Sequence, residues 1–118
     1  MREIKFRAWD KNKKQFISGW TVTGFLSVLN PFERVDISNY EIMQYTGLKD
    51  INGKEIYEGD IIKSLYPDNN LVEYSDEQAL YGYYYESRFG RSWIALYKHL
   101  GDTEVIGNIH ENPDLRGE

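Results

Sequence analysis

The segment from Met43 to Ile62, MQYTGLKDINGKEIYEGDII, constrains the fold more than any other part of the chain because turn-forming residues interrupt it twice. Its first six residues are apolar and aromatic enough for a β-strand, and Asp50, Asn52 and Gly53 follow. Asn and Gly tolerate positive φ, and an Asp side chain can bond its own downstream backbone, so a tight turn is expected. Glu58, Gly59 and Asp60 break the pattern again before a new β-branched run. The segment therefore predicts a strand, a turn and a further strand.

Short alternating runs on both sides of this segment extend the β pattern. From Ile4 to Asp10, alternation places Ile4, Phe6 and Ala8 on one face of a strand. Further strands are predicted at residues 15–17, 40–45, 61–66, 71–75, 81–87, 93–98 and 103–109. Residues 76–80 leave room for one helical turn, although five residues cannot sustain an isolated helix. Short strands at this spacing indicate a small barrel or a sandwich rather than βαβ units. The stretch 18–39 mixes Gly and Pro with apolar residues and receives no assignment.

Composition and charge narrow the class of protein. A chain of 118 residues can bury one modest core, and its aromatic content of 15% suits pleated sheets. Cysteine is absent, no apolar run reaches membrane-spanning length, and the N-terminus lacks the apolar core of a signal peptide. A soluble cytoplasmic protein, without membrane contact, is expected. The whole chain carries −5, but its first 17 residues hold six Lys and Arg against two acids.

Three segments resemble the YopX-like family of small phage and prophage proteins. They are the segment 43–62, the opening REIKFRAWD at 2–10 and the closing EVIGNIHENPDL at 104–115. Three matches in the expected order are more specific than any one alone. The resemblance implies a mainly β fold with a barrel of the SH3 type, and it implies no activity.

The predicted fold class is mainly β, with a small N-terminal antiparallel sheet and a C-terminal SH3-like partial β-barrel. The N-terminal β appendage is assigned to residues 1–54 and the barrel to residues 55–118, as parts of one compact unit. Closing the strands into a barrel removes the unpaired edges that an open sheet exposes.

The residues that suggest chemistry have simpler explanations. Asp50, Asn52 and Gly53 lack the spacing of a calcium loop, because Gly53 stands at the fourth position and Ile61 at the twelfth. The carboxylates of Glu55, Glu58 and Asp60 fit a solvated turn, since no cleft is indicated for paired acid and base roles. His99 and His110 are the only histidines, and without cysteines they make a poor zinc site. No catalytic residue, metal or cofactor is predicted; a hydrolase using His110 with carboxylates is the least favoured alternative.

The most suggestive surface combines tyrosines with basic residues. Tyr81, Tyr83 and Tyr85 share one face of a predicted strand, which Arg88 and Arg91 follow. If that face is exposed, the rings suit stacked bases or a peptide. If it is buried, they fill the barrel and Tyr84 and Glu86 face water, which we prefer because little else is bulky enough. The possible partner surface comprises Lys5, Arg7, Trp9, Tyr83, Tyr85, Arg88 and Arg91.

The predicted function is that of an uncharacterised phage or prophage accessory protein, non-catalytic, acting through an unknown protein partner. The alternative is a small β-barrel that binds nucleic acid, which the basic N-terminus favours and the net negative charge disfavours. The oligomeric state is not indicated by the sequence.

Overall fold

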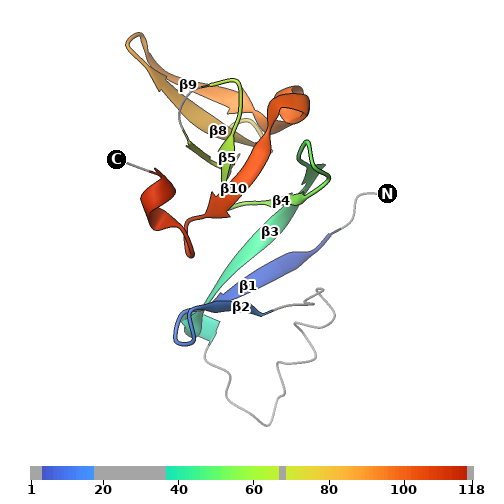
Figure 1. Cartoon of the computed structure of the whole chain (residues 1–118), viewed down its shortest axis with the longest axis vertical. Coiled ribbons are helices and arrows are strands. Elements are labelled where there is room, and N and C mark those ends of the chain that lie inside the picture. The colour runs from blue at the N-terminus through green and yellow to red at the C-terminus, as the bar shows by residue number, and fades with distance from the viewer. Residues whose placement is uncertain (1–3, 18–36, 67–68, 117–118) are drawn as a thin grey trace. The chain divides into compact units, whose positions relative to one another are not determined.

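The computed structural model describes residues 4–17, 37–66 and 69–116, which form short strands joined by tight turns and 3-10 helices (Figure 1). The elements in chain order are β1 (Phe6–Asp10), β2 (Gln15–Ile17), η1 (Ile37–Asn39), β3 (Tyr40–Lys49), β4 (Glu55–Tyr57), β5 (Asp60–Lys63), β6 (Asn70–Leu71), β7 (Glu73–Ser75), β8 (Leu80–Ser87), β9 (Gly90–Ala95), η2 (Leu96–Asp102), β10 (Glu104–Asn108) and η3 (Pro113–Arg116). The predicted fold class, mainly β with an N-terminal antiparallel sheet and a partial barrel, is confirmed. Most of the unassigned stretch, residues 18–36, lies outside the described residues.

The chain divides into two compact units, Met1–Tyr45 and Thr46–Glu118. In the first unit β1 lies between β2 and β3 and pairs antiparallel with both. The sequence predicted the β1–β2 hairpin and a third strand in the same sheet, and both predictions are confirmed. Asp10 closes the hairpin, since its Oδ1 accepts hydrogen bonds from the backbone N–H groups of Asn12 at 2.9 Å and Lys13 at 3.0 Å.

Strand β3 spans the boundary between the two units, which lies between Tyr45 and Thr46. It runs without interruption over residues 40–49, so the strands predicted at 40–45 and 43–48 are one strand. Its first half pairs with β1, and the sheet to which it belongs has the order β2-β1-β3-β4. The predicted division of the chain after residue 54 stays a prediction, because compactness does not test which part folds by itself.

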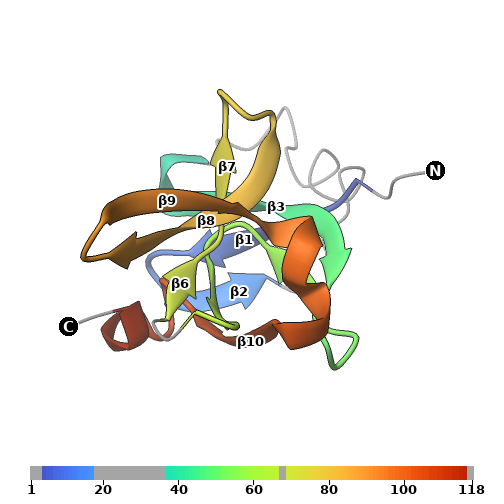
Figure 2. The ribbon, with the colours of Figure 1, turned by 90° about the horizontal axis from the view of Figure 1, so that it is seen from above.

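The second unit contains two three-stranded antiparallel sheets, with orders β10-β5-β6 and β7-β8-β9. Figure 2 shows the strands β7, β8 and β9 of the second of these sheets. The single strand predicted at 71–75 is wrong, because Val72 separates β6 from β7 and the two strands join different sheets. Val72 donates its N–H to the carbonyl of Asp60 and accepts from the N–H of Gly59, both at 2.9 Å. The chain thus changes sheets at Val72 without leaving backbone groups of that residue unsatisfied.

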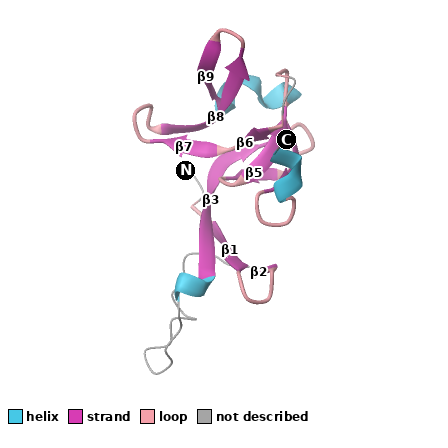
Figure 3. Ribbon diagram, turned by 90° about the vertical axis from the view of Figure 1, so that its left-hand side faces the viewer, coloured by secondary structure: helices cyan, strands magenta, loops and turns pink. Residues whose placement is uncertain are grey.

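One further expectation about this unit is wrong. The strand predicted at 93–98 ends at Ala95, and η2 follows it from Leu96 (Figure 3). Leu96 is fully buried at the start of η2, and Thr103 closes its end, since the Thr103 hydroxyl donates to the carbonyl of His99 at 2.7 Å. The segment that left room for a helical turn is a tight loop between β7 and β8, in which Ala79 has a φ of 54°.

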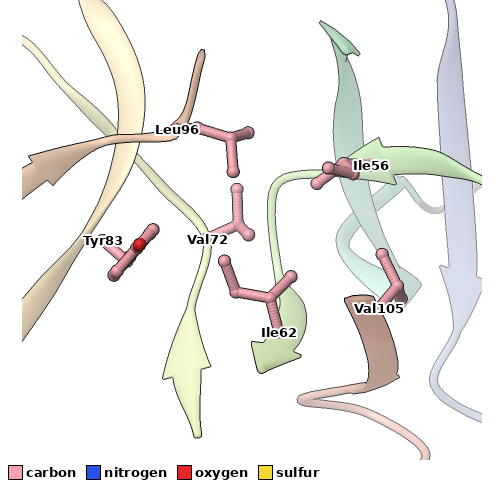
Figure 4. Packing of buried hydrophobic residues seen from close by; sticks show 6 residues of the cluster. All are labelled: Ile56, Ile62, Val72, Tyr83, Leu96 and Val105. Atoms are coloured by element: carbon pink, nitrogen blue, oxygen red, sulfur yellow. The ribbon is translucent and has the colours of Figure 1, made fainter. Parts of the chain in front are cut away.

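The hydrophobic core of the second unit draws one residue from each of several elements: Ile56, Ile62, Val72, Tyr83, Leu96 and Val105. Figure 4 shows Leu96, Val72 and Ile62 pointing toward one another, with Tyr83 beside them. Because these residues come from strands, a crossover and a 3-10 helix, burial of their side chains joins both small sheets.

Candidate partner surface on the β8–β9 hairpin

Asp50 is the first turn residue of the segment 43–62. We call it a latching residue because its carboxylate hydrogen-bonds backbone N–H groups and so holds the turn in place. The residue is buried, and its Oδ1 accepts from the N–H groups of Asn52 at 2.9 Å and Lys54 at 2.8 Å. Its Oδ2 accepts from the N–H of Val105 in β10 at 2.9 Å. Burial alone would raise the pKa of Asp50, but these three N–H groups outweigh it and lower the pKa. The turn predicted from Asp50, Asn52 and Gly53 is confirmed, and Gly53 has a φ of 80°.

The second acidic residue of the segment has a similar role. Asp60 is almost fully buried, and its Oδ2 accepts from the N–H of Tyr57 at 2.8 Å. Glu55 and Glu58 are only half-buried. Among the described residues, no group of three His, Asp or Glu side chains is placed to hold a metal ion. Asp60 therefore stabilises a turn from a buried position. The expectation that these carboxylates lie in a solvated turn is wrong for Asp60.

The two histidines lie in different structural settings. The ring of His99 meets that of Tyr66 edge to face, with centroids 6.1 Å apart. The backbone N–H of His110 donates to Oδ1 of Asn108 at 3.0 Å, within a turn in which Asn108 also accepts from the N–H of Glu111 at 2.8 Å. The strand ending in a turn that was predicted around His110 is what the structure contains.

The tyrosines of β8 alternate between the core and the surface. Tyr83 is fully buried, and its hydroxyl lies 3.1 Å from Oγ of Ser64. Tyr85 is half-buried against Tyr66, with ring centroids 4.6 Å apart, whereas Tyr84 on the opposite face is 39% exposed. The preferred alternative, with these rings inward and Tyr84 and Glu86 outward, is confirmed. Tyr83 is therefore not part of an exposed partner surface.

The outward face of the hairpin carries a stack of one cation and two rings. Tyr84 of β8 lies opposite Trp93 of β9, and their rings meet edge to face with centroids 4.9 Å apart. The guanidinium carbon of Arg91 lies 3.9 Å from the centroid of the Tyr84 ring. Arg91 also faces Glu86, with Nε and Oε1 3.7 Å apart and both side chains exposed. Stacking restricts the guanidinium while leaving donors available to a carboxylate.

Gly82 makes room for the Trp93 ring. A Cβ at Gly82 would meet the carbonyl oxygen of Ile94 and would lie 2.7 Å from Cζ2 of Trp93. The indole therefore packs directly against the backbone of β8. Tyr84 was expected to face water, whereas no role was predicted for Gly82, although the Gly within LYGYYYES was a visible sign of close packing.

The tip of the hairpin exposes an aromatic ring. Phe89 is 91% exposed in the two-residue loop, and the guanidinium carbon of Arg88 lies 5.5 Å from its ring centroid. Figure 1 shows this tip extending away from the other strands of the second unit. We call the set Tyr84, Arg88, Phe89, Arg91 and Trp93 the hairpin surface.

The remaining candidates lie in the first unit, where each basic side chain is close to an aromatic ring. Lys5 Nζ lies 5.4 Å from the ring centroid of Tyr45, and the guanidinium carbon of Arg7 lies 4.6 Å from that of Phe16. Trp9 is only 8% exposed and meets Phe16 edge to face. Lys5 and Arg7 are half-buried, so this face offers less accessible surface than the hairpin. As a buried residue, Trp9 is not available as an exposed contact.

The family follows from a comparison of the sequence with known families. The model of the YopX protein family matches residues 25–115, which is most of the chain. This chain belongs to the YopX family. The predicted resemblance is therefore confirmed, and the match includes the hairpin surface as well as the two latching residues Asp50 and Asp60.

A solved structure shares the fold of this YopX-family chain. It is the crystal structure of protein EF1440 from Enterococcus faecalis, with a TM-score of 0.60 and 26% sequence identity, covering 99% of this chain and 100% of that one. No curated protein matches the sequence significantly. No helix in the described ranges is long and apolar enough to cross a membrane.

Proposed function

We propose that this YopX-family chain is a non-catalytic protein-interaction module whose partner binds the hairpin surface. The observation that carries the proposal is the 91% exposure of Phe89 beside the stacked guanidinium of Arg88. Burying such an exposed ring on binding is favourable, and aromatic and Arg side chains are the residues that most often dominate binding energy. The neighbouring Tyr84, Arg91 and Trp93 extend the same kind of surface along the hairpin.

The absence of catalysis is supported by what the buried acids do. The Oδ atoms of Asp50 accept backbone N–H groups, and Oδ2 of Asp60 does the same. Hydrogen bonds to a carboxylate stabilise its charged form and weaken it as a proton acceptor. These two residues therefore serve the fold, and we expect no turnover that depends on them or on Glu58.

The setting is also part of the proposal. The resemblance to small phage and prophage proteins, together with the lack of cysteine, supports an accessory protein that works in the reducing cytoplasm of a bacterial host. The proposed partner is a protein of that compartment.

Binding of single-stranded nucleic acid is the second candidate. The stacking of Arg91 on Tyr84 favours it, because bases stack on aromatic side chains beside cations. The charge of the second unit opposes it, since residues 46–118 contain 7 Lys and Arg against 14 Asp and Glu. A long polyanion would be repelled by the acidic remainder of the unit wherever it extends beyond the hairpin surface. Protein binding is therefore the stronger proposal.

Affinity capture from an infected or prophage-induced host tests both candidates. Wild type is compared with Phe89→Ser and with Ile51→Ser, which removes another exposed apolar side chain, 59% exposed, from outside the hairpin surface. We expect one protein to be retained by wild type and Ile51→Ser and to bind Phe89→Ser at least about 10-fold more weakly when purified. Equal binding by all three proteins contradicts the proposal. Nuclease-sensitive capture, with affinity falling steeply as salt rises, favours the nucleic-acid candidate instead.

A further inference from the structure

Strand β9 is the longest and most regular sheet edge among the described residues. It pairs with β8 alone, and its six residues match β8 without a register shift. The other edge strands are shorter or interrupted: β2, β4 and β7 have three residues, β6 has two, and β10 has a register shift between Val105 and Gly107. Shortness and bulges are two of the devices that stop an edge from pairing with another chain, and charged side chains are a third. Strand β9 has neither of the first two, and Arg91 is its one charged residue.

The register shows which backbone groups lie along this edge. Ser87 and Gly90 close a two-residue loop, and the residues of an antiparallel ladder alternate between those that exchange hydrogen bonds and those that do not. Gly90 and Ser92 therefore face β8, whereas Arg91 and Trp93 direct their N–H and C=O groups away from it and Ala95 directs its N–H away. The carbonyl of Ala95 belongs to the first turn of η2, of which Ala95 is the N-cap. In the described part of the chain, no backbone bond outside the helices and sheets involves Arg91, Trp93 or Ala95.

The charge along β9 differs from that of its surroundings. Residues 87–101 contain three basic side chains and no acidic one, although the second unit as a whole is acidic. Each of the three cations lies over an aromatic ring, Arg88 over Phe89, Arg91 over Tyr84 and Lys98 over Tyr97, and all three are exposed. An edge strand inside a basic run is complementary to an acidic extended chain.

We propose that β9 accepts an extended acidic segment of a partner protein as an added strand. The segment pairs with the outward N–H and C=O groups of Arg91 and Trp93 and with the N–H of Ala95. It places an acidic side chain beside Arg91 and an apolar one beside Trp93. Backbone pairing supplies affinity and the alternate side chains supply specificity, as in other cases of strand addition. The inference rests on the proposed function and names its recognition mode.

The probe is a ten-residue synthetic peptide in which every second residue is glutamate and valine in turn, with threonine between them, because Arg91 and Trp93 lie two residues apart on one face of β9. It is titrated into the full chain and followed by backbone amide NMR. We expect the largest amide shifts at Arg91, Trp93 and Ala95, with slowed hydrogen exchange at these three positions. A matched peptide with lysine in place of glutamate should bind at least about 10-fold more weakly, since like charges meet at Arg91. Equal binding of the two peptides overturns the acidic character of the segment.

Substitutions at Ala95 test the backbone pairing itself. Ala95 has a φ of −71°, which proline adopts without strain, so Ala95→Pro removes one outward N–H with little change of geometry. We expect Ala95→Pro to bind the acidic peptide about 3- to 10-fold more weakly than the matched Ala95→Ser, which keeps the N–H. A peptide methylated on the valine nitrogens tests the same bonds without altering the protein, and should lose at least as much affinity.

The outcomes separate this inference from the proposed function. Equal binding by Ala95→Pro and Ala95→Ser, with no loss on methylation, overturns strand addition. So does a complete lack of binding by the acidic peptide. If binding of the captured protein still depends on Phe89 in either case, the proposed function stands, but strand addition is not its recognition mode. Protection of the β9 amides by self-association, or displacement of the peptide by oligothymidylate at the same amides, assigns the edge to another occupant and overturns the proposal.

Discussion

The carboxylate of Asp50 and the backbone N–H of Val105 form a 2.9 Å hydrogen bond across 55 residues of sequence. The same carboxylate holds the turn that follows β3, through the N–H groups of Asn52 and Lys54. One buried side chain therefore fixes a local turn and also its attachment to β10, which lies near the end of the chain.

Replacement of Asp50 should destabilise the second unit. Asp50→Ala leaves the N–H of the buried Val105 and those of the exposed Asn52 and Lys54 without their acceptor, so we expect the free energy of unfolding to fall by about 1–3 kcal/mol. Asp50→Asn keeps one acceptor oxygen and should lose less. Urea denaturation measures both, with the exposed Glu77→Ala as a control that changes stability little. Equal stability of Asp50→Ala and wild type would show that the latch is dispensable.

Stability should decrease at acid pH. In Asp50 the N–H bonds outweigh burial and lower the pKa below its ordinary value of 3.8; in Asp10 the bond from Lys13 N–H is the main cause of a lowered pKa. A lowered folded-state pKa gives stability that is complete above the unfolded-state pKa and is lost as pH falls through the folded-state pKa. We expect little change from pH 7 to about 5 and a decline below about pH 4.

Asp50→Asn is the control for this pH dependence. Because the variant lacks the titrating group, its stability should approach that of wild type as the pH drops from about 6 to about 3. Denaturation curves at the two pH values measure the difference in stability between Asp50→Asn and wild type. A difference that stays constant with pH would mean that the charge of Asp50 does not contribute to stability.

Gly82→Ala should displace the Trp93 ring of the hairpin surface. The new Cβ would collide with the carbonyl oxygen of Ile94, which belongs to the backbone and cannot move alone, and with the Trp93 ring. We expect a loss of about 1–3 kcal/mol and a changed tryptophan emission spectrum. Gly101→Ala is the matched control, because a Cβ there meets no atom within 4 Å. Unchanged emission in Gly82→Ala would argue against the packing of Trp93 on β8.

Tyr83 and Tyr84 should respond differently to loss of their hydroxyl groups. Tyr83→Phe removes the contact with Ser64 inside the core, at a cost of about 1 kcal/mol, whereas Tyr84→Phe acts at the surface and should cost almost nothing. Thermal or urea unfolding of both variants measures the difference. A larger effect at Tyr84 would contradict the assignment of faces on β8.

Alkaline pH offers a second measurement on Tyr83. Burial raises its pKa above 10.0, partly offset by the bond with Ser64, and Tyr66 adds to the rise. Above pH 10 the unfolded chain then loses this proton first, so stability should fall as pH rises. Tyr83→Phe should reduce that fall, and an unchanged alkaline profile would contradict it.

The local part of the fold was predictable from the sequence, and the long-range part was not. The turn at Asp50 follows from Asp, Asn and Gly chemistry within four residues. Its bond to Val105 depends on tertiary packing that no local pattern records. Likewise, the apolar run after Trp93 fits a strand by periodicity, yet Leu96 turns into the core at the start of a 3-10 helix.

The candidate surface was only partly predictable, again because burial depends on tertiary packing. Alternation along β8 separates Tyr83 from Tyr84 but does not say which face is buried. The answer depends on the residues packed against Tyr83, such as Val72 and Leu96, which reach it from other elements. Arg88 and Arg91 were identified because they follow the tyrosines directly, whereas the exposed ring of Phe89 was not considered.

The two latching carboxylates of Asp50 and Asp60 also bear on how relatives should be compared. The acidic side chains of this motif bind main-chain amides, so the motif preserves the fold. Proteins that retain it can therefore bind different partners. Homologues of this chain should therefore be sorted into binding groups by the composition of the loop and edge between Ser87 and Ala95. Grouping them by the shared motif would mix different specificities.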